Sequence, residues 1–204
     1  MYNSFYCRII KVAIDFMIAL CFVVLFCWLY LTLAIIVKLD CTSAPAIFKQ
    51  DRIGKHGKVY KMYKFRTMIP GAEHTGSGVY SDHNDDRITK FGLFLRKTSL
   101  DELPQLFNIL KGDMALIGYR SPLTYHPWTW DKYSSEQKLM FEVRPGMTGW
   151  AQVHGRRTTK WDDRIKYNCW YANNVKFSLD VKIFFKTIGM LFTRQDNENK
   201  GKTV

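Results

Sequence analysis

Two adjacent acids, Asp101 and Glu102, are the residues of this sequence whose types and spacing best suit chemistry. They stand in the segment KTSLDELPQL, in a chain of 204 residues whose formal net charge is +12. Paired carboxylates can supply a nucleophile, a general acid or base, or a metal ligand. They can also cap a helix, because Ser99 and Glu102 have the S-x-x-E spacing of a capping box. Both interpretations are open at this point.

Pro104 indicates where the helix around these acids begins. If Ser99 were the cap, Pro104 would be the fifth helical residue and would remove a helical hydrogen bond. If Asp101 is the cap, the proline falls at the third position, whose amide has no helical partner. We therefore expect the helix to begin at Asp101, to show its apolar periodicity over residues 103–110, and to end near Gly112.

That start would place both carboxylates at the positive end of a helix, which also attracts phosphate groups. An acid and a phosphate repel each other unless a cation such as Mg²⁺ bridges them. A carboxylate held in this way could attack phosphorus and form an acyl phosphate. Plain capping remains the alternative that the motif alone does not exclude.

Basic residues are concentrated before the acids, in residues 44–68, which read as two strands joined by a glycine-containing turn. Between Lys49 and Arg66 seven residues are Lys or Arg and one is acidic. Strand alternation puts Lys64 and Arg66 on one face, where two cations could hold a phosphate. The alternative is a solvated surface that faces lipid headgroups next to a membrane anchor.

Further arginines stand at turns marked by Gly and Pro, in the segments IGYRSPL and RPGMTGWAQVHGR; these are Arg120, Arg144 and Arg156. Arginine forks suit phosphate oxygens, although any one of these alone could be a surface residue. The sequence contains no P-loop and no dinucleotide-binding glycine pattern, so the common phosphate-binding folds are not indicated.

Residues 16–37 carry no charge and, as a helix, match the hydrocarbon thickness of a bilayer. Basic residues flank them on both sides, with Arg8 and Lys11 before and Lys38 after, and such cations mark the cytoplasmic side of a membrane. A helix that enters one leaflet, bends and returns would keep both flanks inside, and an ordinary span is the alternative. We expect an uncleaved membrane segment.

The expected fold class is α/β, mostly helical with a small β-hairpin. Residues 1–42 would form a membrane-embedded, re-entrant helix, residues 43–193 a compact cytosolic catalytic domain with interfacial amphipathic helices, and residues 194–204 a disordered tail. The stretch 181–192 would lie either in the headgroup plane or against the core. Five cysteines without zinc-site or disulfide spacing favour a reducing compartment.

Three segments of the chain closely resemble the small monotopic phosphoglycosyl transferases, a bacterial sugar transferase family, and the likeness covers nearly the whole chain. The segments are FKQDRIGKHGKVYKMYKFRTM, DRITKFGLFLRKTSLDELPQLFNILKGDMALIG and RPGMTGWAQVHGR. The resemblance implies transfer of a sugar 1-phosphate from a UDP-sugar to a polyprenyl phosphate such as undecaprenyl phosphate, with release of UMP. It also implies Mg²⁺ as cofactor, membrane lipids but no nucleic acid as partners, and the cytoplasmic face of the bacterial inner membrane as location.

The same resemblance assigns roles to residues. Asp101 matches the Mg²⁺-associated nucleophile that takes the phosphosugar, and Glu102 matches the acid that orients it and assists proton handling. The other matches are basic positions around the phosphates and a glutamine in the GWAQV motif: Lys64, Arg96, Arg144 and Gln152. Together with Arg66 from the strand pattern and Arg120 from GYRSP, these are the expected substrate-binding residues.

One departure from the family concerns the membrane helix. The family often breaks this helix with a Ser-Pro pair, and the corresponding positions here are Cys27 and Trp28. Without proline the bend loses its simplest cause. The charged flanks alone then favour the re-entrant form.

Two other functions fit parts of the sequence. A non-catalytic, membrane-tethered basic module could bind anionic lipid or nucleic acid, and it would not need the acids. A metal-dependent glycosyltransferase could use the acids of the loop 69–87 and would release UDP instead of UMP; these acids are Asp82, Asp85 and Asp86. Turn formation is the more common role of such acids.

Overall fold

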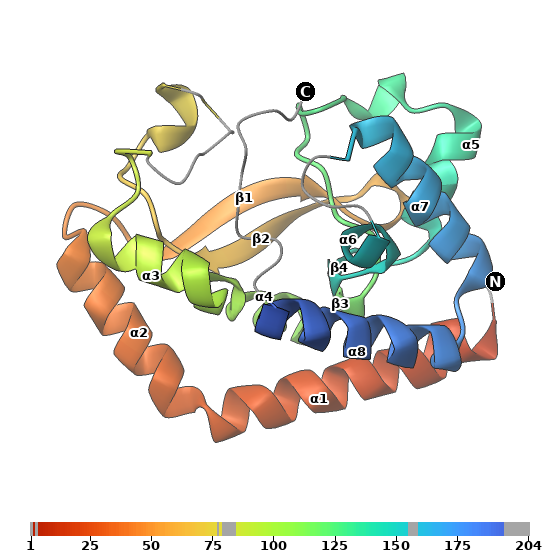
Figure 1. The fold of residues 1–204 in the computed structure, drawn as a ribbon, viewed down its shortest axis with the longest axis horizontal. Coiled ribbons are helices and arrows are strands. Elements are labelled where there is room, and N and C mark those ends of the chain that lie inside the picture. Colours follow the sequence, from red (N-terminus) through yellow and green to blue (C-terminus); the bar gives the residue numbers. More distant parts are fainter. Residues whose placement is uncertain (1, 3, 77, 79–84, 155–158, 194–204) are drawn as a thin grey trace.

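The computed structural model describes residues 2, 4–76, 78, 85–154 and 159–193 (Figure 1). The expected tail at 194–204 lies outside these residues, as do Asp82 and Arg156.

The apolar N-terminal segment forms two helices that meet at a sharp bend. A π-helical turn, η1 (Tyr6–Ile10), leads into α1 (Lys11–Leu25), and α2 (Cys27–Asp40) departs from this direction by 68°. Figure 1 shows α1 along the bottom of the molecule and α2 rising at one side. Within the described residues, no single helix is long and apolar enough to cross a bilayer. The two helices of the bent pair together meet the criteria of length and composition.

The bend forms without a proline. It falls at Phe26, where the backbone leaves the helical region (φ −110°, ψ 21°), immediately before the positions matched to the Ser-Pro pair. The two helices pack on different parts of the domain, since Ala19 of α1 lies in one buried cluster with Met62 and Leu33 of α2 lies in another with Phe65. Packing against two neighbouring surfaces therefore accounts for a bend that the sequence did not explain.

The predicted hairpin is present. The strands β1 (Ile47–Ile53) and β2 (Val59–Phe65) pair antiparallel, and their turn contains the short helix η2 (Lys55–Gly57). A second, parallel pair joins β3 (Ala115–Ile117) to β4 (Gly146–Thr148). This pair was not predicted, because each strand has only three residues and lies among Gly and Pro that indicate turns.

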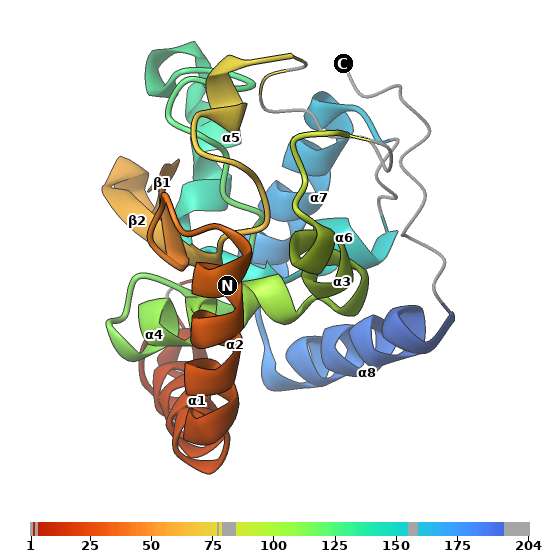
Figure 2. The ribbon, with the colours of Figure 1, turned by 90° about the vertical axis from the view of Figure 1, so that its left-hand side faces the viewer.

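Helices surround these two small sheets, in keeping with a mostly helical α/β fold (Figures 1 and 2). They are η3 (Ala72–His74), α3 (Lys90–Thr98), η4 (Leu100–Glu102), α4 (Gln105–Leu110), η5 (Trp130–Lys132), α5 (Ser135–Lys138), η6 (Leu139–Glu142), α6 (Trp150–His154), α7 (Trp161–Asn174) and α8 (Phe177–Thr193). The largest buried cluster gathers side chains of β3, η6, α7 and α8, among them Phe141 and Tyr171, together with Tyr119 from the segment after β3.

Helix α8 packs against the core, as one of its two alternatives predicted, and its placement in the headgroup plane stays a prediction. Leu179 and Ile183 are buried in the main core. Phe184 and Phe185 on the same helix are 50% and 65% exposed. Core packing thus fixes one face of α8 and leaves an aromatic face outside.

The predicted start of the helix at Asp101 is wrong. Ser99 ends α3 in the left-handed region (φ 57°), and the chain then makes the 3₁₀ turn η4, which contains both acids. The α-helix α4 begins only at Gln105, with Pro104 as its N-cap residue. Proline has no amide hydrogen, so it tolerates this place before the first helical turn without losing a bond.

Gly92 gives a test of the packing between α3 and the chain that follows the hairpin. A Cβ at this position would overlap the backbone of Thr67. We expect Gly92→Ala to lower the free energy of unfolding by about 1–3 kcal/mol, because neither backbone can yield freely. Denaturant unfolding of the detergent-solubilised chain would measure it.

The matched control is Gly189→Ala in α8, where an added Cβ would meet nothing within 4 Å. This variant is expected to be as stable as the wild type or slightly more stable, since alanine favours the helix. Similar losses for both variants would contradict the role given to the contact between Gly92 and Thr67.

Candidate active site

Asp101 and Glu102 lie in η4, and both face Lys64 near the end of β2. The Lys64 Nζ atom is 2.7 Å from Glu102 Oε1 and 3.8 Å from Asp101 Oδ2. The exposed fractions of the side chains are 23% for Lys64, 12% for Asp101 and 31% for Glu102. The structure therefore brings together three of the predicted residues at a partly shielded position.

The capping-box alternative is not supported by this geometry. The Ser99 side chain makes no capping hydrogen bond at the start of η4. The Glu102 carboxylate accepts its hydrogen bond from Lys64 instead. These acids are thus directed at a cation from another element, which a capping role does not require.

Asn108, buried inside α4, holds the turn against β2. Its Oδ1 accepts a hydrogen bond from the Tyr63 amide at 3.0 Å, and its Nδ2 donates to the Lys61 carbonyl at 2.8 Å. The amide side chain thus takes the place of a neighbouring strand at the edge of β2, one residue before Lys64. Sequence reasoning missed this residue, although a lone asparagine among apolar helix positions was the available signal.

The helix α2 supports the other side of the same turn. The hydroxyl of Tyr30 donates to the Leu103 carbonyl at 3.0 Å, and its ring packs edge-on against Phe107. The segment that carries the acids is therefore held between the hairpin and the N-terminal helices.

Arg96 and Arg120 add positive charge around the pair. The Nε of Arg96 donates to Thr67 Oγ1 at 2.9 Å, and burial raises the pKa of Asp101 while the charge of Arg96 partly opposes that rise. Arg120 is exposed, and its charge lowers the pKa of Glu102. Both predicted arginines therefore act electrostatically on the acids.

Arg52 is a third such arginine, and sequence reasoning missed it. Its guanidinium donates to the Ser121 carbonyl at 2.9 Å and to Gln50 Oε1 at 2.6 Å. Burial, followed by the like charge of Arg120, lowers the pKa of Arg52 to about 10. Two arginines that repel each other beside a carboxylate are a favourable place for a further anion. The strand register was the only signal in the sequence that could have pointed to Arg52, since the hairpin pairs it with the buried Tyr60.

The surroundings shift the pKa values of the two acids in opposite directions. Burial raises the pKa of Asp101 above its usual value, against the opposing charge of Lys64. Burial alone would also raise the pKa of Glu102, but Lys64, Arg120 and Arg52 together lower it below its usual value. The surroundings thus favour the protonated form of Asp101 and the ionised form of Glu102, each relative to its usual range.

Replacing Lys64 with methionine is expected to raise the pKa of both Asp101 and Glu102, because a positive neighbour favours the ionised form of each acid. In the variant both carboxyls should therefore stay protonated to higher pH than in the wild type. Carbon NMR of the carboxyl groups in metal-free, detergent-solubilised protein would follow the two titrations.

Lys61→Met is the control for that titration. Lys61 lies on the same strand, is 61% exposed on its side chain, and pairs with Asp51. It should leave both titrations unchanged. An unchanged titration in Lys64→Met as well would show that Lys64 does not act on the pair.

Arg66 and Gln152 have no recorded contact with the acids. The Nε of Arg66 donates to the Pro45 carbonyl at 2.9 Å, and its guanidinium lies 5.5 Å from the Phe48 ring centre. Gln152 buries both polar atoms of its amide, and no described group bonds to either. Such an orphaned amide is suited to a water molecule or a ligand.

Arg144 stands apart from the acid pair in its recorded contacts. It lines a pocket with Arg8 and Lys55, which belong to η1 and to the turn of the hairpin. The resemblance had grouped it with Lys64 and Arg96.

The acids of the loop 69–87 do not form a metal site in the described residues. Arg87 donates to both carboxylate oxygens of Asp85, at 2.8 and 2.6 Å. No group of three or more His, Cys, Asp or Glu occurs in the part of the chain that the structure describes. Asp101 and Glu102 are two carboxylates, and Mg²⁺ is commonly held by one or two carboxylates together with substrate phosphates. This donor set therefore fits Mg²⁺.

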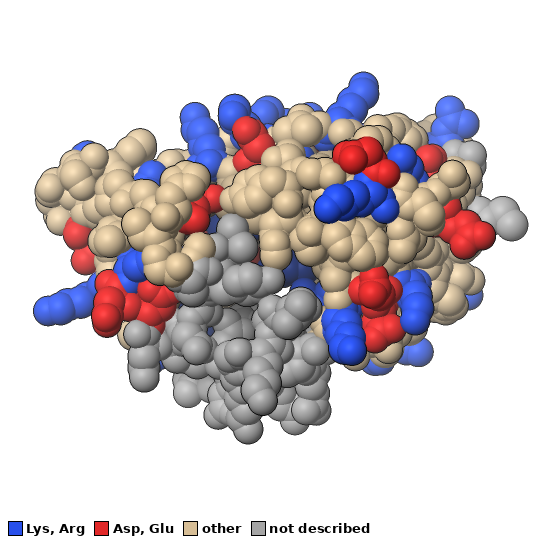
Figure 3. Space-filling view, turned by 90° about the horizontal axis from the view of Figure 1, so that it is seen from above, with Lys and Arg blue, Asp and Glu red and all other residues tan. Residues whose placement is uncertain are grey.

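The net positive charge is not gathered into one patch on the face opposite α1. Figure 3 shows Lys and Arg spread over the described part of that face, with Asp and Glu among them. Binding to nucleic acid generally uses a basic stripe along one face, and this face does not present one.

The comparisons with known proteins agree with these features. A family model described as "bacterial sugar transferase" matches residues 6–194. The "uncharacterized sugar transferase EpsL" of Bacillus subtilis is 43% identical over 147 residues, which are 72% of this chain and 69% of the relative. The "undecaprenyl-phosphate galactose phosphotransferase" of Salmonella typhimurium is 37% identical over 171 residues, 77% of this chain and 35% of the relative.

A third relative extends the match along the chain. The "UDP-N-acetylgalactosamine-undecaprenyl-phosphate N-acetylgalactosaminephosphotransferase" of Aeromonas hydrophila is 40% identical over 187 residues, 90% of this chain and 44% of the relative. The chain thus spans less than half of the two relatives whose names state a substrate.

Proposed function

The chain belongs to the bacterial sugar transferase family, and from this premise we propose that it is a phosphoglycosyl transferase. It transfers a sugar 1-phosphate from a UDP-sugar to a polyprenyl phosphate. The name of the Aeromonas relative gives a UDP-sugar and undecaprenyl phosphate for that protein, and the name of the Salmonella relative gives undecaprenyl phosphate and galactose. The products are UMP and a membrane-bound, diphosphate-linked sugar. The reaction would begin the assembly of a polysaccharide or glycoconjugate.

The observation that carries this proposal is the acid pair within a set of cations. Asp101 lies 3.8 Å from Lys64, and the charges of Arg96, Arg120 and Arg52 act on the pair. A carboxylate that approaches a diphosphate meets growing negative charge, and fixed cations offset it. The arrangement suits attack on phosphorus better than it suits a purely structural role.

In the proposed first step an oxygen of Asp101 attacks the phosphorus that bears the sugar. A bond forms between carboxylate and phosphorus, the bond from that phosphorus to the bridging oxygen breaks, and UMP leaves with the electron pair. In the second step an oxygen of the polyprenyl phosphate attacks the same phosphorus and releases the Asp101 carboxylate. Lys64 and the arginines hold the phosphate oxygens, and Glu102 orients Asp101 and takes part in proton handling at the acceptor.

Mg²⁺ is the proposed cofactor, with Asp101 and the substrate diphosphate as its ligands. When bound, it would supply positive charge that lets a carboxylate and a diphosphate come together. The side chains of the site contribute by positioning the substrates and by offsetting their negative charge.

The bent pair of α1 and α2 supports a membrane role for the N-terminal region. Both helices expose large apolar side chains, among them Val24, Leu25, Trp28 and Leu31, each more than 60% exposed. An exposed apolar surface of this kind suits lipid. We place the protein at the cytoplasmic face of the bacterial inner membrane, with the helix pair re-entrant, so that the acid pair can reach both a soluble donor and a lipid acceptor.

The deciding experiment incubates the full chain in detergent with Mg²⁺, a polyprenyl phosphate and a panel of UDP-sugars, and measures the released nucleotide. UMP from at least one donor supports the proposal. UDP would indicate a glycosyltransferase, and neither nucleotide from any donor would favour a binding module for anionic lipid or nucleic acid.

A further inference from the structure

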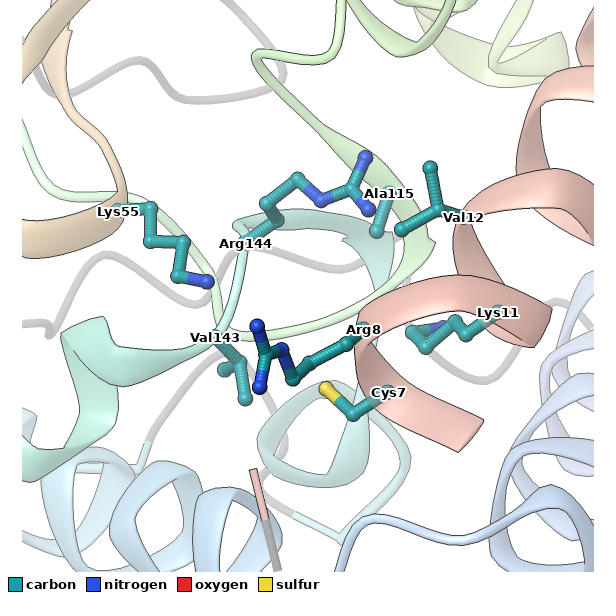
Figure 4. Close-up of a pocket in the computed structure, with 8 residues that line it drawn as sticks. All are labelled: Cys7, Arg8, Lys11, Val12, Lys55, Ala115, Val143 and Arg144. Atoms are coloured by element: carbon teal, nitrogen blue, oxygen red, sulfur yellow. The ribbon is translucent and has the colours of Figure 1, made fainter. Parts of the chain in front are cut away.

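A second concentration of positive charge lies at the turn of the hairpin (Figure 4). A pocket of about 190 Å³ is lined there by four basic side chains, which are Arg8, Lys11, Lys55 and Arg144. They come from η1, α1, η2 and the segment just before β4. In Figure 4 the side chains of Lys55 and Arg8 extend toward the space between them, and Arg144 borders that space with its guanidinium turned toward Ala115 and Val12.

This pocket is far from the acid pair along the hairpin. Lys64 stands near the open end of β2, and Lys55 stands in the turn that precedes Val59. Positions 59 and 64 are five residues apart along the strand, which corresponds to roughly 16 Å. The Lys55 side of the pocket is therefore well separated from Lys64, which pairs with the two acids.

One of the four cations is already neutralised inside the protein. Lys11 Nζ lies 2.9 Å from Asp180 Oδ2 and 3.6 Å from Asp15 Oδ2, and all three side chains are buried. The Cys7 thiol also borders the pocket. Lys11 thus belongs to the structure of the protein and offers little charge to a ligand.

The other three cations lack such a partner. Within the described residues, no carboxylate reaches ion-pair distance of Arg8, Lys55 or Arg144. Three cations held toward one pocket repel one another, and the arrangement becomes favourable when an anion enters. Two of them are arginines, whose planar forks match the oxygens of a phosphate group.

We propose that the pocket formed by Arg8, Lys55 and Arg144 binds a phosphate group, carried either by an anionic lipid headgroup or by a soluble phosphate. The location at the start of the N-terminal helix makes both sources accessible, because Arg8 and Lys55 are exposed. The proposal does not depend on the transferase activity.

The test compares the wild type with a double variant, Arg8→Gln with Lys55→Gln. Its matched control is Lys90→Gln with Lys132→Gln, which removes two exposed cations elsewhere on the chain. One arm measures binding of inorganic phosphate to the detergent-purified chain by calorimetry, without Mg²⁺. The other measures flotation with vesicles of phosphatidylcholine, with and without phosphatidylglycerol.

A loss in the double variant, with binding retained in the control, supports the proposal in either arm. Loss of phosphate binding identifies a soluble ligand, and loss of the preference for phosphatidylglycerol identifies a lipid headgroup. We expect the affinity to fall roughly tenfold for each cation removed. If the double variant matches the control in both arms, the proposal is overturned, whatever the UMP assay shows.

Discussion

UMP release is expected to fall on the order of 10³-fold or more when Asp101 is replaced by asparagine, because loss of a nucleophile removes the covalent route entirely. The side chain keeps nearly the same size, and the ion pair of Asp101 with Lys64 is long, at 3.8 Å. The fold should therefore survive. The assay is the nucleotide measurement with Mg²⁺, polyprenyl phosphate and an active UDP-sugar.

Asp51→Asn is the matched control, because Asp51 is an exposed acid on β1 that pairs with Lys61 at 3.0 Å. It should release UMP at the wild-type rate. A further measurement omits the acceptor and locates the phosphosugar by mass spectrometry of the digested wild-type protein. An adduct on another residue, or undiminished UMP release by Asp101→Asn, would rule out the proposed nucleophile.

The largest loss of stability is expected from Lys11→Met. This change leaves Asp15 and Asp180 buried without their shared cation, and removal of one partner from a buried ion pair costs about 3–5 kcal/mol. Asp180 keeps its hydrogen bonds from Tyr6 and Tyr171, both at 2.7 Å, so the lower part of that range applies. Thermal unfolding in detergent should show a midpoint lower by on the order of 10 °C.

Lys166→Met is the comparison for this variant. Lys166 is 78% exposed on its side chain and pairs with Asp163 at 3.0 Å, and exposed pairs contribute at most about 1 kcal/mol. An unfolding midpoint for Lys11→Met equal to that of Lys166→Met would show that the buried ion pairs of Lys11 with Asp15 and Asp180 do not hold α1 to α8.

Periodic and local features of the chain were predictable from the sequence. The hairpin follows from strand alternation and a glycine-containing turn, and the amphipathic stretch 181–192 falls within α8. The placement of Lys64 beside Asp101 and Glu102 rested on the family resemblance, since 38 residues separate Lys64 from Glu102.

Features that depend on contacts between distant segments were not predictable. The start of the helix near Asp101 was misjudged because Ser99 adopts a left-handed conformation, which the S-x-x-E spacing does not reveal. Arg52 escaped notice because its effect on Glu102 depends on how the loop at Ser121 folds back onto β1. The position of Arg144 likewise depends on the pairing of β4 with β3.

The angle between α1 and α2 has a consequence for how this chain can be engineered. No proline fixes this angle. Ala19 and Leu33 pack in separate buried clusters of the domain, so the rest of the domain sets the angle between the two helices. The first forty residues are thus not an interchangeable cassette: grafted onto an unrelated protein, they would lose the contacts that set the angle between α1 and α2.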